Sequence, residues 1–182
     1  FAFDNKAITD DVGESTIEEL VNAAFTMSKP KTGALIVIER KESLVNIEKT
    51  GILINGIVSS QLLINIFEHN TPLHDGAVLI RGNTIVSATC YLPLSENMRI
   101  SKDLGTRHRA AIGISEVSDS ITIVVSEETG RVSVALGGNL IKVNDSEELR
   151  KELSVLLENT AEEKKSSLWS KLLKGRGNEK DK

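Results

Sequence analysis

Residues 77–92 read AVLIRGNTIVSATCYL, two apolar runs joined by a Gly-Asn pair. A two-residue connection of this kind is typical of a tight β-hairpin, because its turn needs backbone conformations that glycine and asparagine adopt readily. We therefore expect antiparallel strands at 77–81 and 84–92. A second hairpin is expected from the apolar runs at 121–126 and 131–136. Two hairpins predict a sheet that is not wholly parallel.

Other strand and helix patterns surround these hairpins. The run ALIVI at 34–38 is apolar throughout, which indicates a strand covered on both faces. Residues 40–58 show only turn signals, at Gly51 and Asn55-Gly56, and Gly137-Gly138-Asn139 breaks the chain.

Helices are expected where apolar residues recur every three or four positions. Their predicted starts are a capping box at Ser15, Ser59 or Ser60, the run at 105–111, and Asp145 or Ser146. The sequence thus predicts a mixed α/β (α+β) fold in three layers. A central sheet of six or seven strands would carry helices on both faces.

Composition restricts the class of protein further. The chain has 182 residues, 40% of them hydrophobic, which suits one globular domain. Its formal net charge of −4 argues against general nucleic-acid binding, which needs a basic face. Cys90 is the only cysteine, so no disulfide forms within the chain, which fits a reducing compartment. No apolar run approaches the roughly 20 residues that span a bilayer.

The run GTRHRAA at 105–111 has the parts of a phosphate cradle. Thr106 is expected to cap a helix whose free N–H groups point at an anion, and the guanidinium groups of Arg107 and Arg109 match phosphate oxygens. On an ideal helix these two arginines lie about 200° apart, so both reach one ligand only where loop becomes helix. His108 is either a neutral donor to phosphate or a packed structural residue. The alternative for the whole run is a surface helix with ordinary solvated arginines.

The run PLHDGA at 72–77 places Asp75 just before a strand. An acid there can hold a divalent cation or accept a proton from a hydroxyl, and the following glycine lets backbone approach a ligand closely. The structural alternative is an ordinary Asp-Gly turn that opens a strand. His74 is a candidate metal ligand or a solvent-facing loop residue.

Taken together, the motifs resemble a known family. Asp75-Gly76-Ala77, the run at 105–111 and the acidic turn Ser126-Glu127-Glu128-Thr129-Gly130 are similar to those of the diadenylate cyclase (DAC, DisA_N-type) domain, over residues 15–160. Within it the chain resembles the membrane-associated CdaA/DacA type. The resemblance implies a nucleotidyltransferase that condenses two ATP into cyclic di-3′,5′-AMP, a bacterial second messenger, and two pyrophosphates. Each ribose 3′-hydroxyl would attack the α-phosphate of the other ATP across a face-to-face homodimer.

The resemblance also implies roles for individual residues. Asp75 would be the catalytic acid residue and would bind Mg²⁺ or Mn²⁺, with His74, Glu127 and Glu128 as further candidate ligands. The remaining roles are backbone approach to the nucleotide by Gly76 and Ala77, phosphate binding by Thr106, Arg107, His108, Arg109 and Ser126, and adenine or ribose binding by Tyr91, Leu92 and Glu128.

For the ends of the chain, we expect 1–14 to be a lead-in after transmembrane helices that this sequence lacks. Residues 161–182 are expected to be a flexible basic tail, either solvated or an amphipathic segment that touches membrane or a partner. The full-length protein would then lie at the cytoplasmic face of the bacterial membrane, and this portion would be soluble. The family further implies two partners, a YbbR-domain membrane regulator and phosphoglucosamine mutase.

Two other functions remain open on the sequence. One is a nucleotide sensor that binds ATP or cyclic di-AMP without turnover, although a mere binder needs no acidic residues facing a polyanion. The other is an interaction module that docks a membrane partner through its ends.

Overall fold

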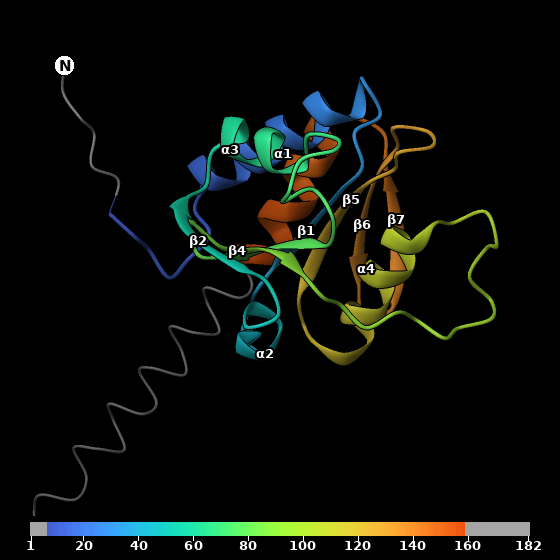
Figure 1. Cartoon of the computed structure of the whole chain (residues 1–182). Helices are drawn as coiled ribbons and strands as arrows, with labels where there is room; N and C mark the ends of the chain where they lie inside the picture. The colour runs from blue at the N-terminus through green and yellow to red at the C-terminus, as the bar shows by residue number, and fades with distance from the viewer. Residues whose placement is uncertain (1–6, 159–182) are drawn as a thin grey trace, which may run out of the picture.

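The computed structural model describes residues 7–158 and has a mixed seven-stranded sheet at its centre (Figure 1). The strands are β1 (Ala34–Ile38), β2 (Ile52–Ile57), β3 (Ala77–Arg81), β4 (Thr84–Cys90), β5 (Ile121–Val125), β6 (Val132–Leu136) and β7 (Asn139–Val143). Their order across the sheet is β2-β4-β3-β1-β5-β6-β7. Only β1 and β3 are parallel neighbours, and every other neighbouring pair is antiparallel. The predicted mixed sheet is confirmed.

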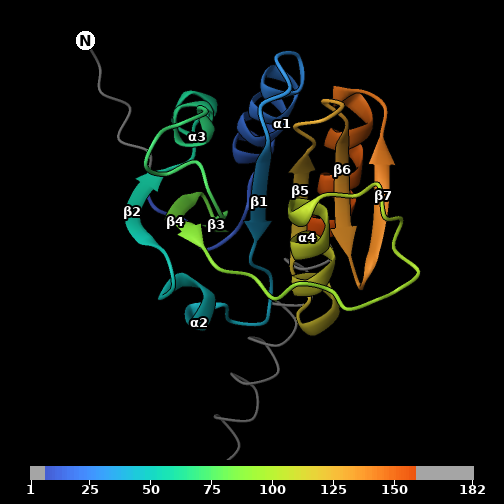
Figure 2. The same cartoon turned by 45° about the vertical axis from the view of Figure 1, so that its right-hand side comes forward.

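Helices cover both faces of this sheet, as the sequence predicts (Figure 2). The helices are α1 (Glu14–Ser28), α2 (Val45–Glu48), α3 (Ser60–Phe67), α4 (Thr106–Val117) and a last helical stretch at 146–158. Apolar residues of α1, α3 and 146–158 form one core cluster with the sheet, and α4 packs in the other. Successive residues of the fully buried strand β1 enter the two clusters alternately, because strand side chains point to opposite faces.

Two helix starts differ from the prediction. The N-cap positions of α1 and α4 are Gly13 and Gly105, and no side-chain hydrogen bond caps either helix. Thr106 is therefore the first helical residue of α4 and not its cap. Both glycines have the extended backbone that an N-cap residue needs, so the cap lies two residues before Ser15 in α1 and one residue before Thr106 in α4. At α3 the prediction is confirmed, since Ser59 accepts the N–H of Leu62.

Two strands, β2 and β7, were missed in the sequence. The signals at Asn55-Gly56 belong to a bulge within β2, where Asn55 has φ 52° and the pairing with β4 shifts. Gly137 and Gly138, with φ 56° and 80°, form the turn that leads directly into β7. Strand β4 also ends at Cys90, two residues before the expected Leu92.

The segment before α1 lies against the β3–β4 hairpin. Asn83 accepts the N–H of Thr9 with its side-chain oxygen and donates to the Ala7 carbonyl, at 2.9 Å in each case. The predicted lead-in is therefore hydrogen-bonded to the hairpin at Ala7 and Thr9, while 1–6 and the predicted tail at 161–182 lie outside the described residues. Within 7–158 no helix is long and apolar enough to cross a membrane.

Candidate functional site

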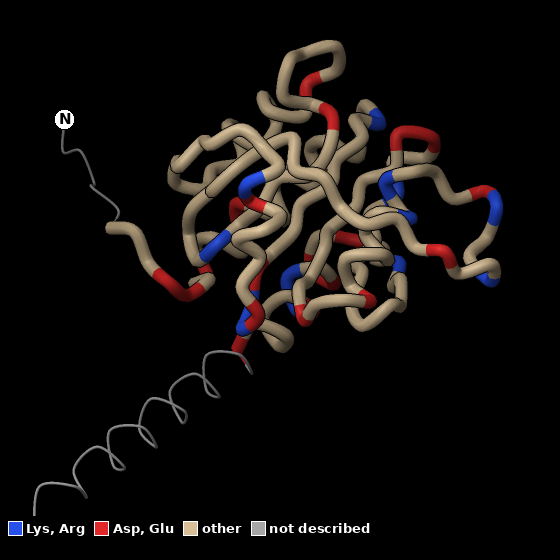
Figure 3. Tube along the Cα trace, turned by 60° about the horizontal axis from the view of Figure 1, so that its bottom comes forward, with Lys and Arg blue, Asp and Glu red and all other residues tan. Residues whose placement is uncertain are grey.

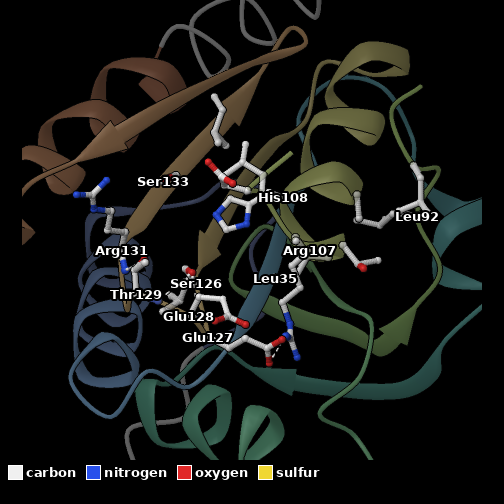
Figure 4. A pocket seen from close by; sticks show the side chains of 18 of the residues that line it. Leu35, Leu92, Arg107, His108, Ser126, Glu127, Glu128, Thr129, Arg131 and Ser133 are labelled. Atoms are coloured by element: carbon white, nitrogen blue, oxygen red, sulfur yellow. Dashed lines mark hydrogen bonds and ion pairs between the residues drawn. The ribbon is translucent and has the colours of Figure 1, made fainter. Parts of the chain in front are cut away.

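A cavity of about 770 Å³ opens at one edge of the sheet, beside the N-terminus of α4 (Figure 4). The residues with predicted roles that line it are Asp75, Gly76, Tyr91, Leu92, Thr106, Arg107, His108, Ser126, Glu127 and Glu128. Residues separated by up to about fifty positions in the chain thus share one space.

Strand pairing explains why these segments meet. Ala77, at the start of β3, pairs with Cys90 at the end of β4, so the Asp75-Gly76 and Tyr91-Leu92 segments leave the sheet together. Ala34, at the start of β1, pairs with Val125 at the end of β5. Since β1 and β3 are parallel neighbours, both pairs of strand ends lie at the same edge. The acidic turn that begins with Ser126 therefore faces the Asp75 segment across β1.

Arg107 lies in the wall of the cavity. Its Nη1 donates to Glu127 Oε2 at 2.8 Å. A Cβ added at Gly33 would stand 2.5 Å from the same Nη1, so the guanidinium group packs directly on this glycine. Arg107 Nε is buried and has no hydrogen-bond partner among the described residues. The cavity thus contains a guanidinium group whose one strong partner is an exposed carboxylate.

Arg109 does not belong to the lining residues of this cavity as the structure describes it. Its carbonyl accepts the N–H of Ser95 at 3.0 Å. The expected pair of phosphate-binding arginines is therefore not brought together, because α4 is already helical at Thr106 and turns the two side chains about 200° apart. The same helix brings Arg107 and its neighbour His108 to the cavity.

His108 is buried against the sheet, with 7% of its surface exposed, and it also lines the cavity. Burial and, to a lesser extent, the charge of Arg107 lower the pKa of its imidazole. His108 is therefore neutral at physiological pH and can offer a neutral N–H without adding positive charge. His108 thus packs against the sheet and also faces the cavity, and its donation to phosphate stays a prediction.

The acidic turn is held rigidly by Ser126. The Ser126 hydroxyl accepts the N–H groups of Glu128 at 3.2 Å and Thr129 at 3.3 Å. Gly130 has φ 72°, and a Cβ there would stand 2.3 Å from the Ser28 carbonyl oxygen, so only glycine lets the turn pack on the end of α1. Glu127 and Glu128 are exposed at the mouth of the cavity as a result.

The Asp75 carboxylate is also at the mouth, with 87% of its side chain exposed. Its Oδ1 lies 3.4 Å from Nε2 of His74, whose Nδ1 lies 2.6 Å from the Thr71 carbonyl oxygen. Because a carbonyl only accepts, Nδ1 donates to Thr71, and Nε2 is the ring nitrogen that faces Asp75. A carboxylate oxygen and an imidazole nitrogen are both ligand types that divalent cations bind.

The other expected ligands do not complete a metal site. Within 7–158 no three His, Cys, Asp or Glu side chains are grouped so that they could hold a metal ion. Glu127 is instead paired with Arg107. A cation at Asp75 and His74 would need oxygen ligands from a bound molecule.

Gly76 and Ala77 shape the entrance to β3. Gly76 has φ 79°, and a Cβ there would stand 2.8 Å from the Cys90 carbonyl oxygen, so the close approach is made to β4. Ala77 is 1% exposed within the core and does not belong to the described lining of the cavity.

Tyr91 and Leu92 present one exposed and one buried side chain, at 80% and 8% exposure. The Tyr91 N–H donates to the Thr50 hydroxyl at 2.8 Å. This hydrogen bond fixes the backbone where the chain leaves β4 beside the cavity.

Part of the lining was missed in the sequence. Arg131, Ser133, Leu140 and Lys142 line the cavity from β6, β7 and the turn before them. Lys142 pairs with Ser133 in the β6–β7 ladder. Because β7 was not predicted as a strand, there was no reason in the sequence to expect these two residues side by side.

Lysine and arginine residues are interspersed with acidic residues along the described trace (Figure 3). No continuous basic stripe is visible in that view of residues 7–158.

Two named proteins are similar to this chain over most of its length. A Bacillus subtilis protein named cyclic di-AMP synthase CdaA is 51% identical over 160 residues, 88% of this chain and 59% of its own length. A Listeria monocytogenes protein named diadenylate cyclase is 54% identical over 157 residues, 85% of this chain and 56% of its own length. The chain thus spans less than two thirds of these curated relatives.

Solved structures agree with the fold. A crystal structure of a double mutant of DacA from Staphylococcus aureus has a TM-score of 0.77 and 46% identity, covering 79% of this chain and 96% of that one. A Bacillus cereus structure titled as a hypothetical membrane spanning protein has a TM-score of 0.70 and 47% identity, covering 73% and 64% of the two chains. The DAC family, described as the DisA bacterial checkpoint controller nucleotide-binding domain, matches residues 21–140. On its sequence, its fold and the segments that meet in its cavity, this chain belongs to the DAC family.

Proposed function

We propose that this chain is the catalytic unit of a diadenylate cyclase, which condenses two ATP into cyclic di-3′,5′-AMP and two pyrophosphates. One observation carries the proposal: Asp75, Arg107 and Ser126 share a single cavity although they come from three separate segments. The names of the B. subtilis and L. monocytogenes relatives support it.

The triphosphate binds at the start of α4. The free N–H groups of the first helical turn, with Thr106 as its first residue, face the α-phosphate, and the Ser126 hydroxyl and the neutral His108 ring add donors. Arg107 exchanges its contact with Glu127 for a phosphate oxygen. These groups hold the α-phosphate still and neutralise the charge that develops on it. Arg109 lies outside the described lining of this cavity, so its predicted contact with phosphate stays a prediction.

The attacking 3′-hydroxyl loses its proton at Asp75, whose exposed carboxylate can reach a group outside its own cavity. A bound Mg²⁺ or Mn²⁺ lowers the pKa of a coordinated hydroxyl, which makes this proton easier to remove. Asp75 and His74 would hold that ion on the protein side, and Glu127 becomes free to assist once Arg107 has turned to phosphate. The O3′–P bond then forms, the bond from the α-phosphorus to pyrophosphate breaks, and pyrophosphate takes the bonding electron pair.

The nucleoside lies over Tyr91 and Leu92, which offer a ring face and an apolar side chain to adenine. Glu128 accepts a hydrogen bond from the ribose. Gly76 lines the same entrance with backbone alone, which leaves room for the sugar.

Catalysis requires two copies, because one cavity holds one ATP and the product needs two. In a face-to-face homodimer, each Asp75 activates the hydroxyl that attacks the nucleotide of the other copy.

Residues 15–160 form the cyclase domain in this proposal. The full-length protein lies at the cytoplasmic face of the bacterial membrane, where a YbbR-domain regulator and phosphoglucosamine mutase are its expected partners.

The direct test is incubation of the chain with ATP and Mn²⁺, followed by detection of cyclic di-AMP by mass spectrometry. Formation of cyclic di-AMP and pyrophosphate in a 1:2 ratio supports the cyclase. Saturable ATP binding with no product would instead identify the non-catalytic sensor.

A further inference from the structure

The cavity extends past the predicted phosphate-binding residues, onto the α4-facing side of β6 and β7. Arg131 directly precedes β6, and Ser133, the second residue of that strand, is the ladder partner of Lys142 in β7. Arg131, Ser133 and Lys142 all line the cavity, so the two cations border its β6–β7 end.

Neither cation is neutralised by the rest of the described chain. Within residues 7–158 no carboxylate lies within ion-pair distance of Arg131 or Lys142, whereas Arg107, Arg81 and Arg150 all have acidic partners there. Four acidic residues do line the cavity, namely Asp75, Asp103, Glu127 and Glu128. Figure 4 shows Glu127 turned toward Arg107, with Arg131 on the opposite side. Positive charge without a partner thus gathers at the β6–β7 end.

The two ends of the cavity are connected by short steps. Arg107 contacts Glu127, which follows Ser126 directly, and the Ser126 N–H donates to the Arg131 carbonyl at 3.0 Å. Neighbouring strands are about 4.8 Å apart, so Lys142 lies only about two strand spacings from β5. A triphosphate whose α-phosphate lies at Ser126 and Arg107 can therefore reach Arg131 and Lys142 with its other phosphates.

We propose that Arg131 and Lys142 form a second anion-binding end, which takes the β- and γ-phosphates of a bound nucleoside triphosphate and then the pyrophosphate that leaves. The inference rests on the proposed function for the identity of the nucleotide. When the bond to the α-phosphorus breaks, pyrophosphate takes the electron pair, and these two cations neutralise the charge that develops on it.

The neutral state of His108 supports the need for such cations. Burial lowers the pKa of the His108 imidazole, so this ring brings no positive charge to a tetra-anionic ligand. Arg107 is the one cation at the α4 end of the described cavity lining, and it is shared with Glu127. The β6–β7 end supplies the charge that this end lacks.

Binding without turnover tests the proposal. The full chain is titrated with 3′-deoxy-ATP, which lacks the attacking hydroxyl, and separately with AMP, both with Mg²⁺. The double variant Arg131→Gln/Lys142→Gln should lose about tenfold or more in affinity for 3′-deoxy-ATP, because hydrogen bonds to charged groups are lost. Its affinity for AMP should stay within about twofold of the parent chain.

The matched control is Lys49→Gln/Lys151→Gln, which removes the same charge from exposed positions outside the cavity lining. It should leave both affinities nearly unchanged. The proposal is overturned if the parent chain binds 3′-deoxy-ATP no better than AMP, or if the Arg131/Lys142 variant loses affinity for both ligands equally, or for neither. Lys142→Gln alone, on the edge strand β7, gives a smaller selective loss if the double variant does not fold.

The outcome is separable from that of the proposed function. A chain that favours 3′-deoxy-ATP through Arg131 and Lys142 but makes no cyclic di-AMP from ATP would retain this inference and refute the cyclase. A chain that makes cyclic di-AMP while the double variant keeps full 3′-deoxy-ATP affinity would do the reverse.

Discussion

The guanidinium group of Arg107 is paired with the Glu127 carboxylate at 2.8 Å, across the mouth of the cavity. Arg107 comes from the first turn of α4 and Glu127 from the turn after β5. The ion pair therefore joins the two segments between which a phosphate group would bind. A phosphate ligand has to compete with Glu127 for the same donor.

Removing this competitor should strengthen phosphate binding. Glu127→Gln keeps the shape of the side chain but removes its charge, and a partly exposed ion pair contributes about 0.2–1 kcal/mol. In the absence of divalent cations, we expect 3′-deoxy-ATP to bind up to about fivefold more tightly, as measured by isothermal titration calorimetry. Glu14→Gln, an exposed site outside the cavity lining, should leave the affinity unchanged. Weaker binding by the Glu127 variant would show that this carboxylate helps to hold the ligand.

Thr50 should act as a positioning residue for the proposed adenine wall. Its hydroxyl accepts the Tyr91 N–H and donates to the Ile47 carbonyl, so it ties the exit of β4 to the end of α2. Thr50→Val removes both hydrogen bonds, and we expect KM for ATP to rise several-fold with kcat little changed. Thr50→Ser keeps the hydroxyl and should restore the parent KM. Equal kinetics for the two variants would remove Thr50 from this role.

His108 should make stability depend on pH. Its pKa is lowered in the folded chain, so the unfolded chain takes up a proton first as the pH falls through about 6.5. Stability from the buried neutral ring is therefore present at pH 7.5 and is lost on acidification below about 6.5. Urea unfolding should give a smaller drop between pH 7.5 and 5.5 for His108→Gln than for the parent chain.

His69→Gln is the control for this measurement, because His69 is exposed and outside the cavity lining. This variant should keep the parent chain's full drop in stability between the two pH values. If His108→Gln also keeps it, another group is responsible for the pH dependence.

Dilution should reveal the need for two copies. Asp75 is 87% exposed at the mouth of the cavity, a position from which it can serve a second copy. Specific activity should fall as the protein is diluted below the dissociation constant of the dimer, and sedimentation velocity should show dissociation over the same range. Constant specific activity across a range in which sedimentation shows dissociation into monomers would contradict the two-copy reaction.

Much of the architecture could be predicted because local sequence patterns determine many of its strands and turns. The β3–β4 hairpin follows from Gly82-Asn83, and the doubly covered β1 follows from five apolar residues in succession. Strands β2 and β7 could not be predicted in this way. Asn55 and the glycines before Asn139 look like chain breaks in the sequence, and only pairing with β4 and β6 makes their neighbours strands.

The predicted site was incomplete for a related reason. Motif spacing could bring Asp75 and Arg107 into one hypothesis, and the structure places both at one cavity. The direction of each α4 side chain depends on where the helix begins, and its start at Thr106 separates Arg109 from the cavity. Arg131 and Lys142 carry no motif at all. They became candidates only when the structure showed that both line the cavity.

In the proposed mechanism, Asp75 activates the hydroxyl that attacks the α-phosphate. The decisive measurement compares cyclic di-AMP formation by the parent chain and by Asp75→Asn at saturating ATP and Mn²⁺, alongside 3′-deoxy-ATP affinity with Mg²⁺. We predict a loss of about 10²–10⁴ in rate with affinity changed only slightly, since Arg107 and Ser126 remain in place. Cyclic di-AMP formation by Asp75→Asn at the parent rate would contradict the proposed mechanism.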